Sequence, residues 1–210
     1  MAAPTPVSSL VHSSTLVTAV IYLIIRYGEV LEGNASLIVL SSGTILLAGW
    51  CACYENDIKK VIALSTLRQL GEMLFSLGLG SYILSFYHLL IHSMFKALLF
   101  ICAGRIIHIN VNIQDSRLIG GVSHISFFHR LSFIVCSLSL IGFPFIAGFY
   151  SKDLIYEYVY FSFYMLLRSF IFLVGIFFTR VYRIRLLKLA FLGCNKGLRK
   201  GVLLDDFLIS

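Results

Sequence analysis

The sequence reads ILSFYHLLIHSMFKALLFICAGRI from Ile83 to Ile106, an almost unbroken apolar run. A helix of about 20 mostly apolar residues crosses a bilayer, so this run is long enough to do so. Apart from Arg105 near its end, the titratable side chains of His88, His92 and Lys96 nevertheless lie inside it. An ionisable group in the hydrocarbon region costs at least about 2.5 to 3.5 kcal/mol on insertion scales, which makes each of them a candidate functional residue.

The composition of the whole chain also predicts a membrane protein. Of its 210 residues, 59% are hydrophobic and 13% are charged, and the mean hydropathy is +0.91. A soluble domain carries about 25% charged residues. These values exclude a disordered chain, a disulfide scaffold and a soluble nucleotide-binding enzyme. The five cysteines lie scattered in apolar stretches without a C-x-x-C pair, so we interpret them as small buried side chains and predict no metal site.

Hydropathy along the chain predicts an all-α, polytopic transmembrane bundle of about six spans. The expected spans are residues 7–25, 35–54, 58–79, 83–106, 131–158 and 159–180. We expect one transmembrane domain over residues 1–190 and a basic tail over residues 191–210. No basic region precedes the first apolar run, so the N-terminus does not resemble a signal peptide.

Basic residues are distributed unevenly between the two sides of this predicted bundle. If the spans alternate in direction, the connections after the second, fourth and sixth spans carry twelve Lys and Arg, and the opposite side carries two. The twelve are Lys59, Lys60, Arg105, Arg117, Arg130, Arg180, Arg183, Arg185, Lys188, Lys196, Arg199 and Lys200, and the two are Arg26 and Arg168. This bias places the basic side on the cytoplasmic or mitochondrial-matrix face. It explains most of the formal charge of +7 without a nucleic-acid partner.

His88, His92 and Lys96 are spaced at i, i+4 and i+8, which stacks them along one face of a helix. Groups that titrate near neutral pH can pass a proton along such a row through bridging water. The alternative is that these side chains only form hydrogen bonds between neighbouring helices. A zinc site is disfavoured, because Lys96 would repel the cation and no glutamate lies between the two histidines.

A second candidate site lies where a helix should break. Pro144, between Gly142 and Gly148, is expected to divide the fifth span into two half-helices. Broken transmembrane helices place free backbone groups at mid-membrane, where transporters build ion sites. Lys152 follows the break by about two turns. The alternative is that Lys152 snorkels to an interface and pairs with a neighbouring carboxylate.

Two further polar groups lie in the first and third predicted spans. His12 lies among serines and threonines in the first span, and it is either a satisfied buried side chain or a member of a proton relay. Asp57 is a plausible N-cap, and Arg68 and Glu72, at i and i+4, can pair with each other. We interpret residues 57–72 as a capped helix with a polar seam toward its neighbours.

These motifs together resemble a known family. The chain is similar to the subunit 5 family of mitochondrial NADH dehydrogenase (complex I), antiporter-like proton-pumping membrane subunits. The resemblance rests on residues 3–19 (APTPVSSLVHSSTLVTA), 57–67 (DIKKVIALSTL), 88–100 (HLLIHSMFKALLF), 114–121 (QDSRLIGG) and 147–153 (AGFYSKD). The matches run in order from the N-terminus to about Leu187.

The resemblance implies a proton-translocating subunit of NADH:ubiquinone oxidoreductase in the mitochondrial inner membrane, with a fold of two inverted five-helix repeats. It implies that His12, His88, His92 and Lys96 belong to a central polar axis and that Lys152 is the key lysine of the second broken helix. Other complex I subunits and membrane lipid are the implied partners. No cofactor is expected in this chain, because NADH, flavin, iron–sulfur clusters and ubiquinone belong to other subunits.

The chain also departs from the family pattern. The family's first broken helix lies upstream of the residues present here, so we expect a separate chain or a missing segment to supply the first half of the subunit. Arg68, Glu72 and Arg105 stand where uncharged residues are expected. A subunit of a multisubunit cation/proton antiporter and an inactive structural fragment are the alternative interpretations.

Overall fold

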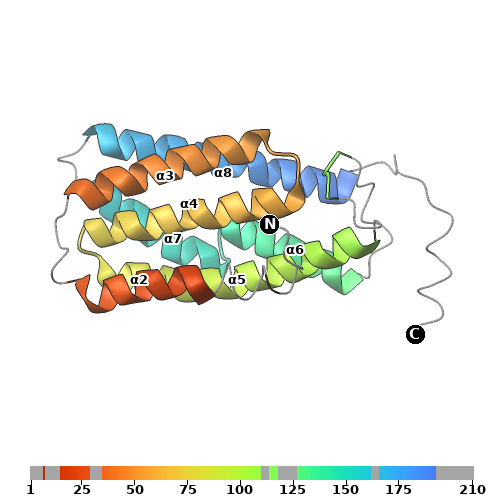
Figure 1. The fold of residues 1–210 in the computed structure, drawn as a ribbon, viewed down its shortest axis with the longest axis horizontal. Helices are drawn as coiled ribbons and strands as arrows, with labels where there is room; N and C mark the ends of the chain where they lie inside the picture. The colour runs from red at the N-terminus through yellow and green to blue at the C-terminus, as the bar shows by residue number, and fades with distance from the viewer. Residues whose placement is uncertain are drawn as a thin grey trace.

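The computed structural model describes residues 7, 15–28, 35–109, 114–117, 127–161 and 166–192, and in these ranges it forms seven helices and no strand. The helices are α2 (Leu16–Arg26), α3 (Ala35–Tyr54), α4 (Ile58–Gly78), α5 (Tyr82–Ile109), α6 (Phe127–Ile141), α7 (Ala147–Phe161) and α8 (Leu166–Leu192). They lie side by side along the long axis of the molecule (Figure 1). The predicted all-α bundle is confirmed, and its fifth span is a broken helix, α6 and α7.

Helix α4 forms the interior of the bundle. It packs against α3 on one side and α5 on the other, while α8 covers α3 and α7 packs against α5 (Figure 1). Its apolar side chains enter four clusters; Ile62 joins α5 and α6, and Met73 joins α2 and α5. Its buried polar residues, which include Arg68, Gln69 and Glu72, face other helices, which is the condition under which so polar a segment is tolerated in a membrane.

The basic connections gather at one end of the bundle. The amide of Ser116 donates to the carbonyl of Asn56 at 2.9 Å, so the segment after α5 lies against the segment after α3. Arg185, on α8, donates to the carbonyl of Cys53 at 2.6 Å. The predicted alternation of the spans is thus observed among these connections (Figure 1).

The remaining connections meet at the opposite end. The hydroxyl of Tyr82 donates to the carbonyl of Gly28 at 3.0 Å, and that of Tyr158 donates to the carbonyl of Leu79 at 3.3 Å. Helix α4 ends there because Gly80 adopts a φ of +88°, a left-handed conformation that closes the last turn.

Two side chains differ from their predicted roles. Arg183 was assigned to the basic connection after the sixth span, but it is 1% exposed, because α8 continues well past Arg180 and carries Arg183 along the bundle. Asp57 occupies the N-cap position of α4 without a side-chain bond to the helix. Its carboxylate instead forms an ion pair with Lys60 at 2.8 Å.

Length and composition single out two described helices as able to cross a membrane, over Ser36–Tyr54 and Tyr82–Ile109. Helices α2 and α6 are apolar but shorter. Helix α4 contains charged residues within its apolar sequence, and the fifth span is divided into two helices. The number of six spans stays a prediction.

Candidate polar site between helices α4, α5, α6 and α7

The break between α6 and α7 is a defined backbone structure. Helix α6 ends because Gly142 adopts a φ of +82°, and the amide of Phe143 then donates to the carbonyl of Leu138 at 3.1 Å, as in a Schellman motif. Pro144 lies in the interruption, and α7 begins at Ala147. Gly148, in the first turn of α7, lies so close to α6 that a Cβ there would be 1.9 Å from the carbonyl oxygen of Ser139.

Lys152 is buried beside this break. Its ammonium group donates to the carbonyl of Leu140, one of the last carbonyls of α6, which have no intrahelical partner. The C-terminus of a helix carries a partial negative charge that favours a cation. With 2% of its surface exposed, Lys152 faces the interior and does not snorkel to an interface.

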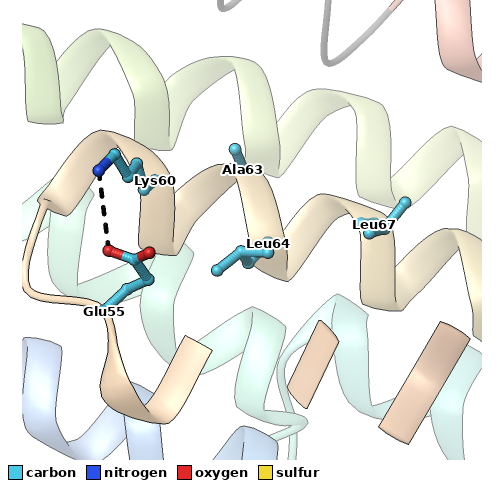
Figure 2. A pocket seen from close by; sticks show the side chains of 5 residues that line it. All are labelled: Glu55, Lys60, Ala63, Leu64 and Leu67. Atoms are coloured by element: carbon cyan, nitrogen blue, oxygen red, sulfur yellow. Dashed lines mark ion pairs between the residues drawn. The ribbon is translucent and has the colours of Figure 1, made fainter. Parts of the chain in front are cut away.

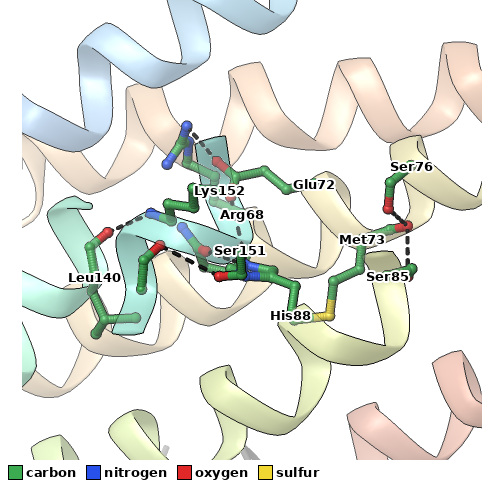
Figure 3. A network of polar contacts seen from close by, with 11 residues as sticks. Arg68, Glu72, Met73, Ser76, Ser85, His88, Leu140, Ser151 and Lys152 are labelled. Atoms are coloured by element: carbon green, nitrogen blue, oxygen red, sulfur yellow. Dashed lines mark hydrogen bonds and ion pairs between the residues drawn. The ribbon is translucent and has the colours of Figure 1, made fainter. Parts of the chain in front are cut away.

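His88 connects three helices. Its Nδ1 lies 3.0 Å from the hydroxyl of Ser151 on α7, and its Nε2 lies 3.0 Å from Oε1 of Gln69 on α4. Because Ser151 precedes Lys152, this imidazole and the lysine belong to one polar cluster (Figure 3). A neutral imidazole with two polar partners can gain a proton at one nitrogen and lose one at the other.

Lys96 and His92 continue the row along α5. Lys96 is fully buried and donates to the hydroxyl of Ser65 at 2.5 Å and to the carbonyl of Ile62 at 3.3 Å. The rings of His88 and His92 have centroids 6.2 Å apart, and neither nitrogen of His92 has a hydrogen-bond partner among the described residues. All three side chains of the row are therefore buried, whereas His12 lies outside the described residues.

Sequence reasoning missed the partners of this row. Ser65 and Gln69 lie at i and i+4 on α4 and face Lys96 and His88 respectively. Their helical spacing matches that of the row, which is the signal that could have identified them. The bond between Lys152 and α6 joins two segments through a backbone carbonyl, so no side-chain pattern could have predicted it.

Arg68 and Glu72 form the predicted pair on α4, with Nη2 and Oε1 2.8 Å apart. Both side chains are buried, and the second carboxylate oxygen of Glu72 lies 4.0 Å from Nε2 of His88. The polar seam of α4 therefore reaches the cluster around His88.

An open pocket of about 300 Å³ lies at the basic end of α4 (Figure 2). Its lining consists of Glu55, Lys60, Ala63, Leu64 and Leu67. The nitrogen of Lys60 is 3.9 Å from the carboxylate of Glu55, a weak surface ion pair. None of the predicted site residues lines this pocket. The described residues contain no group of three or more His, Cys, Asp or Glu that could hold a metal ion.

The sequence of this chain is similar to those of known membrane proteins. A family described as NADH:quinone oxidoreductase/Mrp antiporter, TM, matches residues 1–179. NADH-ubiquinone oxidoreductase chain 5 of Artemia franciscana is 50% identical over 200 residues, which cover 94% of this chain and 37% of that protein. The protein of the same name from Anopheles gambiae is 52% identical over 189 residues, covering 89% and 33%. These relatives confirm the resemblance found in the sequence.

The fold has a counterpart among solved structures. A chain of the membrane-bound sulfane sulfur reductase, an archaeal respiratory membrane complex, superposes with a TM-score of 0.80 at 22% identity, over 99% of this chain and 46% of that one. This likeness supports the fold alone. The chain spans about a third of the length of the curated relatives it matches.

Proposed function

This chain belongs to the NADH:quinone oxidoreductase/Mrp antiporter transmembrane family, and from that membership we propose that it translocates protons as part of a respiratory NADH:ubiquinone oxidoreductase. Its animal relatives, each about half identical in sequence and named as chain 5 of that enzyme, support this function over that of a cation/proton antiporter. We place the chain in the mitochondrial inner membrane for the same reason. The electron-transfer cofactors bind in other subunits of the proposed complex.

The observation that carries the proposal is the position of His88 between α4 and α7. Its two ring nitrogens each have a polar partner at 3.0 Å, and the partner on α7 adjoins Lys152. A proton released by Lys152 can reach Nδ1 through bridging water and the hydroxyl of Ser151, since water and a hydroxyl both donate and accept. Lys152, His88 and Ser151 therefore form the centre of the path.

His92 and Lys96 extend the path along α5. Their side chains lie one turn apart on the buried face, and Lys96 is anchored to α4 through Ser65. Transfer between the ring of His92 and its neighbours requires bridging water, which hydrogen-bonds to buried polar groups at little entropic cost. His12 is proposed as a further relay residue on the strength of the family resemblance.

The break provides a reason for Lys152 to exist in two states. When protonated, it is stabilised by the carbonyl end of α6; when neutral, it no longer gains from that helix dipole. Coupling follows if electron transfer elsewhere in the complex alters the electrostatic potential at this lysine. We propose that the parts of the relatives that this chain does not match are supplied by another polypeptide or by a longer form of this one.

The test is Lys152→Ala in the assembled complex within sealed vesicles. The ratio of protons translocated to electrons transferred should fall, because the central donor of the path is lost. Lys188→Ala removes an exposed lysine from α8 and is the matched control. An unchanged ratio in the Lys152 variant would refute the function, and sodium transport without NADH oxidation would assign the chain to an antiporter.

A further inference from the structure

The buried ion pair on α4 is not required by the proposed path. Arg68 is 0% exposed and Glu72 is 1% exposed, and they contact each other at 2.8 Å. Removing two charges from water costs several kcal/mol per ion, so replacing such a pair with apolar residues is often neutral or stabilising. Stability alone therefore does not explain why this ion pair is buried.

The two oxygens of Glu72 face different partners. Oε1 contacts Arg68, while Oε2 lies 4.0 Å from Nε2 of His88 (Figure 3). The same Nε2 lies 3.0 Å from Oε1 of Gln69, an acceptor, so that nitrogen carries the hydrogen. A second proton on the ring must then enter at Nδ1, on the side of Ser151. The resulting imidazolium would point its Nε2–H edge toward the carboxylate.

The backbones of α3 and α8 pass close to the side chain of Arg68. A Cβ at Gly49 of α3 would lie 3.8 Å from Cδ of Arg68, and one at Gly175 of α8 would lie 3.9 Å from its Nε. Neither Nε nor Nη1 has a hydrogen-bond partner among the described residues. The charge of Arg68 is thus directed to Glu72, which holds the carboxylate on the side of α4 nearest His88.

We propose that Glu72 is the counter-ion of protonated His88 and that Arg68 positions its carboxylate. Glu72 stays ionised throughout: the ring gains a proton at Nδ1 and loses one, and no proton passes to the carboxylate. At 4.0 Å from Nε2, the carboxylate attracts a positive charge on the ring and so offsets part of the cost of burying that charge. Both are positioning residues, and the inference rests on the proposed function.

The polar groups around His88 come from α4, α5 and α7. They are Arg68, Gln69 and Glu72 from α4, His92 from α5, and Ser151 and Lys152 from α7. Glu72 is the acidic side chain among them, whereas Arg68 and Lys152 are cationic and would oppose a positive charge on the ring. Loss of Glu72 should therefore make the charged ring harder to form.

The experiment removes both charges of the pair together, because Glu72→Gln alone would leave the buried Arg68 without a counter-ion. Arg68→Gln/Glu72→Gln keeps the local charge balanced, and it is measured in the assembled complex in sealed vesicles. We expect normal amounts of complex, a lower ratio of protons to electrons, and a pH profile of pumping displaced to lower pH. The displacement follows because a ring without its counter-ion needs a higher proton concentration to become charged.

A charge exchange, Arg68→Glu/Glu72→Arg, is the second variant. It keeps an ion pair on α4 but places a cation against the ring, so the proposal expects pumping to fall further. Unchanged pumping and an unchanged pH profile in the first variant would overturn the proposal, as would failure of that variant to assemble, which would assign the pair to stability. If Lys152→Ala also leaves pumping unchanged, the proposed function itself fails.

Discussion

Gly148→Ala should separate the two halves of the broken helix. The added Cβ would lie 1.9 Å from the carbonyl oxygen of Ser139, and 2.8 Å from its carbonyl carbon. Even in a close C–H···O contact the carbon stays at least ~3.3 Å from the oxygen, so α6 and α7 must move apart by about 1.4 Å. Both contacted atoms are backbone, and no side-chain rotation can relieve the clash.

The displacement has a cost in stability and a cost in function. Overpacking of this kind destabilises a protein by about 1 to 3 kcal/mol, and occasionally by more. It also moves Lys152, on α7, away from the carbonyl of Leu140, on α6. A shift of that size takes a hydrogen bond outside its normal range of about 2.7 to 3.2 Å. The lysine would then lose the helix end that stabilises its charged form.

The assay compares Gly148→Ala with Gly43→Ala in the assembled complex. A Cβ at Gly43, inside α3, meets nothing within 4 Å, so that variant should be neutral or more stable, by up to about 1 kcal/mol from helix propensity. We expect Gly148→Ala to lower both the thermal midpoint and the ratio of protons to electrons. Equal thermal midpoints and equal pumping in the two variants would refute the reasoning from the close approach.

Three further predictions concern the contacts around this site. Arg185→Gln removes hydrogen bonds to Cys53 and Asn56, each 2.6 Å long, and should lower the free energy of unfolding by about 1.5 to 3 kcal/mol. The thermal midpoint should fall relative to that of the control Lys188→Gln, and equal midpoints in the two variants would contradict the prediction. Ser65→Ala removes the hydroxyl that accepts from Lys96 and should slow pumping in vesicles, whereas Ser137→Ala, whose hydroxyl bonds within its own helix to Ile134, should not. The third concerns Asp115, whose pKa is raised above 3.8, chiefly by a hydrogen bond with Asp57. Its stabilising contribution is therefore present below that pH and lost as the pH rises through the raised pKa, so Asp115→Asn, uncharged at every pH, should slow amide exchange of Ser116 at neutral pH. An unchanged exchange rate would disprove that account.

Local patterns in the sequence predicted most of the helices. The break at Pro144 was predictable because proline cannot continue a helix and Gly142 can adopt a left-handed conformation, and both act within a few residues. The i, i+4 spacing likewise predicted the pair of Arg68 and Glu72. The role of Arg183 was mispredicted because a basic residue near a helix end is usually exposed, and only packing reveals that it is buried.

The sequence by itself determined that the chain is a helical membrane protein, which helix breaks, and which ionisable residues lie inside apolar runs. These properties follow from composition and from periodicity along one segment. Only the tertiary structure decided that Lys152 bonds to the end of α6, that His88 lies between Gln69 and Ser151, and that Glu72 faces the same ring. Contacts between helices depend on how their axes pack, and residues on different helices, here 12 to 63 positions apart, carry no shared local signal of that packing.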